Sequence, residues 1–435
     1  MTGRNLMRLY RIVPALLISV AVVGPARAAA EGLAGPSLTV NELVARALRD
    51  NPELRAARTA IDAARGQLRQ AGLRPNPMLD LNGSQNVAGP DNMQTIGISW
   101  PLDLAGRKPA RVAVAERALA LRIAQVTDGE RRLAADVRMK AGDILAAARN
   151  LRITDELIAA NREMERLVSR RVREGATPPL DRQLLLVEVT RLEAQRAGQA
   201  GRLDGLRLQL TPLIGMAPAA PPDVADELEA VPAVPDQSAA MTQALAERPD
   251  LQAAVLEEQL ASARVDKERA EGRYDASLVA QYQRQDTGFD LMAFNSAGRL
   301  KPIQDVFHYV TIGISITLPV RNRNQGAIAA ARADLQGGQR RREAVDLLVR
   351  QEVATAYAQY EAAARASDIY ATQVLAMARR NFDVVRQSYQ LGRGSLLDVI
   401  AEQRRLIELE MGYTDTVKQR WDAAVDIQRA VGRVP

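Results

Sequence analysis

Residues 47–54 read ALRDNPEL, and residues 244–251 read ALAERPDL, 197 positions further along the chain. A second match follows in the same order, because the segment IGIS at residues 96–99 returns at residues 312–315. Matches that keep their order over most of a chain indicate a duplicated structural unit. The sequence therefore predicts two copies of one fold.

The separation between matching segments grows from 197 to 216 residues between these two pairs, so the second copy carries an insertion. We place the insertion within residues 286–307. The first copy is expected at residues 29–215 and the second at residues 238–435. Residues 216–237 form the linker between them and contain five prolines, at positions 218, 221, 222, 232 and 235. Proline cannot continue a helix, so the linker is expected to be extended and on the surface.

Long helices dominate each copy. Residues 110–177 and 321–434 contain no proline and are rich in Ala, Leu, Arg and Glu, which favour helix. The predicted helices span about 104–174 and 178–214 in the first copy and about 322–391 and 395–432 in the second. At about 1.5 Å per residue, a helix of some seventy residues is a rod of roughly 105 Å. A short helix capped by Thr39 or Asn41 and a second one starting near Pro52 precede the first long helix.

Four segments alternate between apolar and small polar residues, which is the period of a strand. The predicted strands are at about 78–86 and 93–102 in the first copy and about 276–286 and 308–319 in the second. The residues expected on the apolar face, facing lipid, are Ile96, Ile98, Trp100, Ile312, Ile314 and Ile316. Trp100 and Tyr309 are expected to lie at membrane boundaries.

A half-buried sheet in a soluble protein has the same alternation, so the strands alone leave two interpretations open. Four strands cannot close a barrel, and an open edge cannot face lipid. Three copies would supply twelve strands, a number that membrane barrels use. The membrane interpretation thus requires a homotrimer.

The N-terminus predicts export. Residues 1–28 combine a basic start, an apolar run and the Ala26-Arg27-Ala28 pattern of a signal peptide, with Ala30 as an alternative cleavage position. The signal carries four arginines, so its removal reduces the formal net charge from +6 to +2. Nothing in the remaining charge pattern favours nucleic acid. No later stretch is apolar for the length of a transmembrane helix.

The residue types that carry catalysis and metal binding are scarce. The chain has one histidine, His308, and no cysteine, and its methionines are scattered. Tight sites for transition metals need imidazole, thiolate or thioether groups, so neither a metal site nor a cofactor is expected. His308 is expected beside a strand in a loop or interfacial role. No nucleophile or phosphate-loop motif is present, so the sequence predicts a protein that is not an enzyme.

Three further segments point to a known family: IGISWPLDLAGR at residues 96–107, ITLPVRNRNQG at residues 316–326 and LGRGSLLD at residues 391–398. With the duplicated hairpin units, the whole mature chain resembles the TolC-type outer-membrane efflux family of Gram-negative bacteria. The resemblance implies a mainly α fold with a transmembrane β part, in which a trimer forms a 12-stranded outer-membrane barrel on a periplasmic α-helical tunnel. The segments at 103–107 and 318–326 are most similar to the CzcC-type heavy-metal branch. A duct for drugs or small organic molecules remains open, as does an exported coiled-coil scaffold from a different class.

The resemblance also implies partners: outer-membrane lipid, a periplasmic adaptor (membrane fusion) protein and an inner-membrane pump of the resistance-nodulation-division class. The adaptor would contact the turns between the long helices. These tip residues are Gly175, Ala176, Thr177, Leu180, Gly392, Arg393, Gly394, Ser395 and Leu396. Locally, Thr177 before Pro178 predicts a helix N-cap, and Ser395 with Asp398 predicts a capping box. Asp181 and Asp398 occupy equivalent positions and are expected to line the aperture, where six carboxylates would favour cations.

Overall fold

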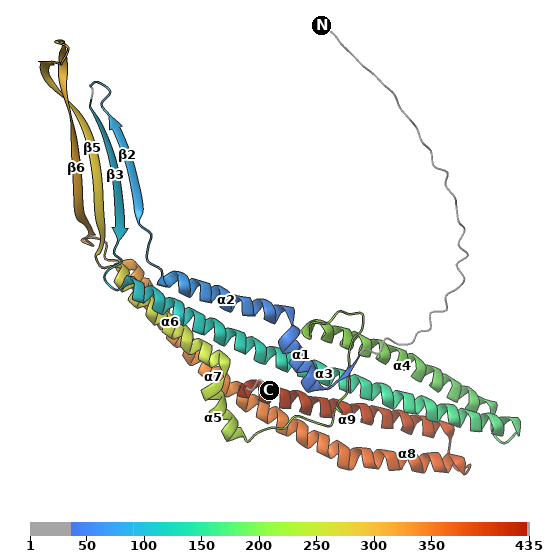
Figure 1. The fold of residues 1–435 in the computed structure, drawn as a ribbon. Coiled ribbons are helices and arrows are strands. Elements are labelled where there is room, and N and C mark those ends of the chain that lie inside the picture. The colour runs from blue at the N-terminus through green and yellow to red at the C-terminus, as the bar shows by residue number, and fades with distance from the viewer. Residues whose placement is uncertain (1–35, 90, 433–435) are drawn as a thin grey trace, which may run out of the picture.

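The computed structural model describes residues 36–89 and 91–432, so the predicted signal peptide and both candidate cleavage positions lie outside the described residues. Figure 1 shows an elongated molecule, with a sheet at one end and long helices running away from it. Over the described ranges, no helix is both long enough and apolar enough to cross a membrane. The sheet and the far turns of the helices are thus the most widely separated parts of the fold.

The main sheet joins the hairpins of the two copies side by side. It is antiparallel and has the order β2-β3-β5-β6. The strands are β2 (Met78–Gln85), β3 (Asn92–Pro101), β5 (Asp275–Phe294) and β6 (Leu300–Thr317). The register places Ile98 of β3 opposite Ala280 of β5, and Ala280 opposite Ile312 of β6. In the described part of the chain, β2 and β6 each have one paired neighbour, so both outer edges are open.

The second hairpin is longer than the sequence analysis expects, and this prediction is corrected. Strands were predicted at 276–286 and 308–319, but β5 continues to Phe294 and β6 begins at Leu300. The insertion at residues 286–307 therefore lengthens the two strands instead of forming a loop between them.

Local chemistry explains the longer hairpin. β-favouring side chains continue through the insertion, and Phe289 pairs with Ile303 beyond the point where β3 ends. A tight turn then closes the hairpin, in which the Asn295 N–H donates to the Arg299 carbonyl at 2.9 Å. Gly298 has a φ of +76°, a conformation that favours glycine. The strands end where this turn begins.

Two helical hairpins form the body of the molecule (Figure 1). Their helices are α3 (Arg107–Arg173) and α4 (Pro179–Leu213) in the first copy, and α7 (Gln325–Ile369), η1 (Tyr370–Val374), α8 (Leu375–Gln390) and α9 (Leu396–Val431) in the second. The 67 residues of α3 make a rod of about 100 Å. α3 begins later than expected because Asp103, Ala105 and Gly106 all have positive φ and cannot extend it.

The long helix of the second copy is not continuous, contrary to the single helix predicted at 322–391. One π-helical turn, η1, separates α7 from α8. Buried side chains follow one face of α7 up to Ser367 and resume in α8 at Leu375, eight residues later. Two regular turns span about 7.2 residues, so the wider turn absorbs the extra residue and keeps both sets on one face.

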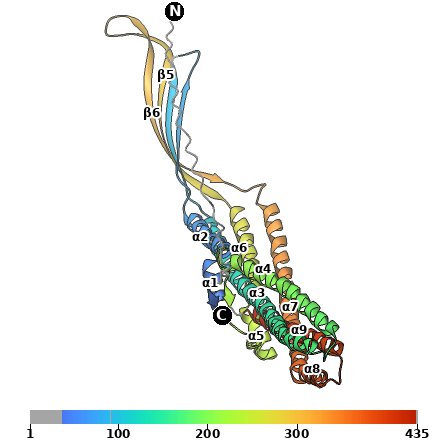
Figure 2. The same ribbon diagram turned by 90° about the vertical axis from the view of Figure 1, so that its right-hand side faces the viewer.

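Shorter elements lie beside the long helices, from the middle of the molecule to the base of the sheet. They are β1 (Ser37–Leu38), α1 (Val40–Asp50), α2 (Pro52–Gly72), β4 (Asp223–Val224), α5 (Gln237–Glu247) and α6 (Pro249–Glu271). Thr39 caps α1 through a full capping box with Glu42. β1 pairs in parallel with β4, which lies in the proline-rich linker. Figure 2 shows α1 and α5 beside the long helices, well away from the sheet.

The largest core joins α1, α3, α4 and α9 at this level. Its members include Leu43, Val137, Ile144, Leu210 and Trp421. The Trp421 indole donates to the Arg138 carbonyl at 3.0 Å. A Cβ on Gly142 would lie 2.6 Å from Trp421 Cδ1, so this glycine makes room for the indole. The core thereby fixes the two helical hairpins to each other.

Candidate functional site

The sheet has one convex apolar face. All six side chains predicted to face lipid lie on it, together with the apolar residues paired with them in β2 and β5: Leu79, Leu81, Leu278, Ala280 and Tyr282. Many of these side chains are exposed in the single chain, with exposed fractions of 65% for Ile314 and 52% for Trp100. From Ile316 to Val310 the apolar belt is about 20 Å tall at strand spacing. That height approaches the apolar band of about 25 Å on a membrane barrel.

The opposite face is concave and polar. Ile96 is 52% exposed, whereas its neighbour Thr95 on the other face is only 7% exposed. The low exposed fraction of Thr95 indicates that its face is the sheltered, concave side of the curved sheet that Figure 1 shows. Most side chains on this face are polar and uncharged over the same rows, with Asp80 and Val279 as exceptions, and they include Thr95, Ser99, Ser277, Gln281, Gln283, Thr311 and Ser315. A closed sheet with this curvature would have a polar interior and an apolar exterior.

The two aromatic residues predicted at membrane boundaries lie on different faces. Trp100 is on the convex face, whereas Tyr309 shares the concave face with Thr311, so the two residues are not anchors on one common surface. The aromatic residue at a boundary position that the sequence analysis did not single out is Tyr282. It lies at the upper end of the apolar belt, and its hydroxyl is 2.6 Å from Nδ1 of His308. His308 itself lies within β6 and not in a loop.

The turns at the far ends of the two helical hairpins have the same backbone structure. Gly175 and Gly392 have φ values of +74° and +72°. The N–H of Gly175 donates to Val172 and that of Ala176 to Arg171, and the same pair of bonds recurs at Gly392 and Arg393. This arrangement is a Schellman motif, which ends a helix by satisfying its last carbonyls. Both turns are therefore compact.

The returning helices begin differently from their predicted caps. α4 starts at Pro179 with Pro178 as its N-cap, so Thr177 does not cap it. The reason is the double proline, because Pro179 occupies the first helical position, where no N–H is needed. Ser395 accepts from the Leu397 N–H at 3.1 Å, but Asp398 does not complete a capping box.

The tip side chains divide into buried and exposed sets. Leu396 is 2% exposed and packs with Val168, Leu185 and Tyr389, so its predicted contact with a partner is wrong. Leu396, the first residue of α9, points into this cluster, whereas its neighbour Leu397 is 59% exposed. Exposed apolar side chains at the tips also include Leu180 and Leu391.

Gly394 lies in an exposed turn but has little space for a side chain. A Cβ there would lie 3.3 Å from the Tyr389 backbone nitrogen, a tight contact within the turn itself. A large side chain at Gly394 would therefore strain the tip as well as block a partner. Gly175 and Gly392 have open space at the Cβ position, although their positive φ disfavours other residues.

The two aperture candidates have different surroundings. Asp181 and Asp398 are each the third residue of a helix. The Tyr389 hydroxyl donates to Asp181 at 3.4 Å, which links the first helical hairpin to the second. Burial, and next the Asp181 charge, raise the pKa of Tyr389. Asp398 is exposed, and no hydrogen bond to its side chain is present among the described residues.

The junction between the two short helices of each copy contacts the end of a long helix. In the first copy this residue is Asn51, whose side chain caps α2 at Leu54 and donates to the Leu213 carbonyl at 3.0 Å. In the second copy it is Arg248, which donates to the Ala430 carbonyl at 3.3 Å. Both contacts join equivalent positions of the repeat.

Arg248 is also the centre of a buried ion-pair network. It is 2% exposed, forms an ion pair with Asp250 at 2.8 Å and contacts Glu352 of α7. Arg131 of α3 lies 3.5 Å from Asp250 and donates to the Arg429 carbonyl at 2.5 Å. Burial works to raise the pKa of Asp250, but the hydrogen bond and charge of Arg248 outweigh it and hold the pKa below its usual value of 3.8. The network joins α3, α6, α7 and α9.

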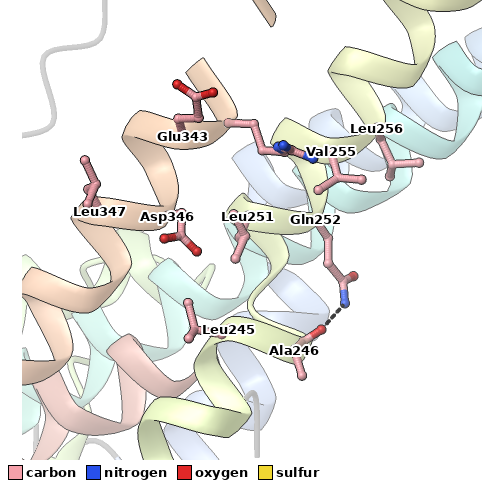
Figure 3. A pocket seen from close by; sticks show the side chains of 10 residues that line it. Leu245, Ala246, Leu251, Gln252, Val255, Leu256, Glu343, Asp346 and Leu347 are labelled. Carbon is pink, nitrogen blue, oxygen red and sulfur yellow. Dashed lines mark hydrogen bonds between the residues drawn. The ribbon is translucent and has the colours of Figure 1, made fainter. Parts of the chain in front are cut away.

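An open groove of about 820 Å³ lies between α5, α6 and α7 (Figure 3). Its walls are apolar at Leu251, Val255 and Leu347. The first-copy equivalents of Val255 and Leu347 are Arg58 and Glu130, which form an ion pair at 2.6 Å across the corresponding space. Over the described residues, no three His, Asp or Glu side chains are placed to hold a metal ion.

Comparisons with known proteins agree with this architecture. A family model described as outer membrane efflux protein matches residues 43–215 and 240–433, on either side of the proline-rich linker. The chain is 25% identical over 402 residues to the cobalt-zinc-cadmium resistance protein CzcC of Cupriavidus metallidurans, which covers 92% of this chain and 91% of that protein.

Solved structures share the fold at lower identity. CusC, whose structures concern folding and transmembrane channel formation, has a TM-score of 0.72 and 20% identity over 92% of this chain and 93% of its own. The outer membrane protein VceC of Vibrio cholerae has a TM-score of 0.71 and 19% identity over 90% of this chain and 96% of its own. The resemblance predicted from the sequence is confirmed.

Proposed function

The chain belongs to the outer membrane efflux protein family, and we propose that three copies of it form the exit duct of a tripartite efflux system. Members of this family are channels of the outer membrane and not enzymes. The observation that carries the proposal is the curved sheet, with its apolar convex face, its polar concave face and its two open edges. Three such sheets joined edge to edge supply twelve strands and leave no edge facing lipid.

The helices are arranged so that a trimer could also close below the sheet. Within one chain α2 packs on α3, α3 on α6, and α6 on α7. The duplication makes α2 equivalent to α6 and α3 equivalent to α7. The contact of α3 with α6 inside one chain is therefore the pattern for a contact of α7 with α2 of the next chain in the trimer. Repeated around a threefold axis, this contact closes a tunnel below the barrel.

The tips are the proposed contact for a periplasmic adaptor, itself attached to an inner-membrane pump of the resistance-nodulation-division class. They lie about 100 Å from the sheet by helical rise, which is deep in the periplasm. Their compact glycine turns present exposed Leu180, Leu391 and Leu397. Exposed apolar side chains that gather at one end of a molecule favour a protein contact there.

We propose heavy-metal cations as the substrates, because the relative CzcC is a cobalt-zinc-cadmium resistance protein. Asp181 and Asp398 would place six carboxylates near the aperture of the trimer, which favours cations over anions. In this account the duct conducts passively and the pump selects the substrate.

The substrate proposal is tested by export in cells that lack the chain. Restoring the chain should lower the cellular content of cobalt, zinc and cadmium, and Leu180→Asp with Leu397→Asp should abolish this effect while leaving trimer yield unchanged. Lower accumulation of a lipophilic dye with no change in metal content would instead identify a duct for small organic molecules. Release of the wild-type protein from envelopes by salt alone would favour a scaffold and contradict the duct.

A further inference from the structure

The apolar convex face of the sheet continues to the base, which is the end nearest the long helices (Figure 1). Leu318 directly follows β6 and Tyr274 directly precedes β5, and both residues keep the alternation of the convex face. They are 68% and 52% exposed in the single chain. From Val310 to Leu318 the apolar face is about 26 Å tall at strand spacing, which matches the apolar band of a membrane barrel. The residues that follow Leu318 therefore lie at the membrane surface on the side of the helices.

Basic side chains dominate the connections at the base. Residues 318–333, which lead from β6 into α7, include three arginines and no acidic residue. Residues 63–79, which lead from α2 into β2, also include three arginines and no acidic residue. By contrast, residues 284–306 at the outer end of the second hairpin carry three basic and three acidic side chains. The excess positive charge thus lies at the end of the sheet that faces the helices.

The connection between β6 and α7 is held against the end of α6. The Asn324 side chain donates to the Glu268 carbonyl at 3.0 Å and to its carboxylate at 2.7 Å. A Cβ on Gly272 would lie 2.3 Å from the Arg323 carbonyl oxygen, so the two backbones pass directly beside each other. Arg323 is therefore a neighbour of Arg273, the last residue before the apolar Tyr274.

The acidic side chains at the base already have basic partners. These ion pairs join Asp275 and Glu271 to Arg107, Asp103 to Arg111, and Glu268 to Lys267. Four other arginines at the base are exposed and have no ion-pair partner among the described residues: Arg74, Arg273, Arg321 and Arg323. We call these four residues the basic belt. Its charge is available to a ligand from outside the chain.

We propose that the basic belt binds the phosphate groups of anionic phospholipids in the leaflet of the outer membrane that faces the periplasm. This inference rests on the proposed duct, whose sheet crosses the membrane, and it adds a lipid as a ligand. A guanidinium group matches a phosphate group in both charge and geometry. Basic side chains next to a membrane segment favour anionic lipids over zwitterionic ones.

The apolar side chains beside the belt favour a lipid over a soluble anion. Val320 lies between Leu318 and Arg321 in the chain and is 72% exposed. A free phosphate ion gains nothing from such neighbours. A phospholipid contacts the basic side chains with its headgroup and the apolar side chains with its acyl chains, which removes apolar surface from water.

Lipid binding to the purified full-length trimer tests the inference. The trimer in uncharged detergent is mixed with equal amounts of phosphatidylglycerol and phosphatidylcholine, and the bound lipids are counted by native mass spectrometry. The wild type should bind mainly phosphatidylglycerol. Arg321→Gln with Arg323→Gln should lower the ratio of bound phosphatidylglycerol to phosphatidylcholine about tenfold. The matched control, Arg152→Gln with Arg405→Gln, removes two exposed arginines far from the sheet and should leave the ratio unchanged.

The wild-type chain provides a second test that does not depend on the folding of a variant. High salt screens the arginines and should reduce the preference for phosphatidylglycerol, so a preference that is independent of salt would overturn the inference. Stronger displacement of the lipid by inorganic phosphate than by sodium chloride of equal ionic strength would indicate a site for a soluble anion and would also overturn it.

The lipid site and the duct can fail separately. Equal ratios for the wild type and Arg321→Gln with Arg323→Gln, or an equal loss in the control variant, would overturn the basic belt as a lipid site. If such trimers still conduct in planar bilayers, only the lipid site is wrong. If the wild-type chain forms no trimer in the membrane, the proposed duct fails together with it.

Discussion

The two copies of the repeat have the same backbone conformation at their helix ends but differ in side chains where their surroundings differ. Gly175 and Gly392 end equivalent helices with the same Schellman motif. The junction residues show the opposite behaviour, because Asn51 is neutral while Arg248 is the centre of a buried ion-pair network. After duplication, positions that need a particular φ stay fixed, whereas positions that contact a neighbour adapt to that neighbour.

The largest expected difference between the copies is at these junctions. Arg248→Ala removes a buried guanidinium and leaves the half-buried Asp250 without its closest cation, which costs about 3 kcal/mol of stability. Asn51→Ala removes a helix cap and one bond to Leu213, and costs about 1–2 kcal/mol. Thermal unfolding of each variant in detergent measures which of the two stability losses is larger. A larger loss for Asn51→Ala would show that the ion-pair network contributes little.

The sheet offers a second comparison, in which the copies should behave alike. Ile98 and Ile314 are equivalent residues on the convex face, so arginine at either position should cost about 2–4 kcal/mol near the membrane midplane. Arginine at Ser99 or Ser315 would enter the lumen and should be tolerated. Folded trimer yield measures all four variants. Equal yields on the two faces would contradict the assignment of lipid and lumen.

The glycines that end α4 and α9 differ in how closely their surroundings pack. Gly215 and Gly432 are equivalent and both have positive φ, which costs other residues about 1–2 kcal/mol. A Cβ on Gly215 would lie 2.4 Å from the Asp50 carbonyl oxygen, while one on Gly432 would lie 3.1 Å from Arg248 Cα. Gly215→Ala should therefore cost about 1–3 kcal/mol more than Gly432→Ala. Equal melting temperatures for the two variants would mean that the backbone around Asp50 moves to make room for the added methyl group.

Acid should weaken the second-copy junction. The pKa of Asp250 is below 3.8 in the folded chain because Arg248 outweighs the effect of burial. A carboxyl with a lowered pKa stabilises the fold above its unfolded value, and this contribution is lost as the pH falls through the folded pKa. The stability difference between wild type and Arg248→Ala should therefore shrink below pH 3.8. If this stability difference stays constant down to pH 2, Asp250 is not the partner through which Arg248 stabilises the fold.

The smallest expected effect concerns the groove in Figure 3. Val255→Arg with Leu347→Glu would transfer the first-copy pair of Arg58 and Glu130 to the second copy. Exposed ion pairs contribute about 0–1 kcal/mol, so stability and trimer yield should change little. Loss of export with normal trimer yield would indicate that the open groove is needed for a partner.

Much of this molecule could be predicted from local patterns. Strand alternation assigned Ile96, Ile312 and their neighbours to one face because side-chain direction in a strand depends only on register. The same rule could have excluded Tyr309 from the lipid face, since it alternates with Thr311. The longer second hairpin was missed because the inserted residues have no counterpart in the first copy.

The remaining features depend on contacts that are distant in the sequence. Arg248 bonds to residues 104 and 182 positions away, so no local pattern reveals its network. Leu396 looked like a tip contact from its place in the turn, but packing against Tyr389 and Val168 buries it. The π turn at Tyr370–Val374 accommodates one extra residue between the buried positions of α7 and α8. These buried positions are defined by packing against α9, which is distant in the sequence.

Three copies of the chain are proposed to enclose a pore, with the concave face of each sheet inside. The most direct test uses single-channel recording of Ser315→Cys, since the chain has no other thiol. A charged thiol reagent should reduce the conductance in three discrete steps, one for each copy, and should leave the neighbouring convex-face variant Ile314→Cys unaffected. Block of Ile314→Cys instead, a different number of steps, or no conductance at all would contradict the account.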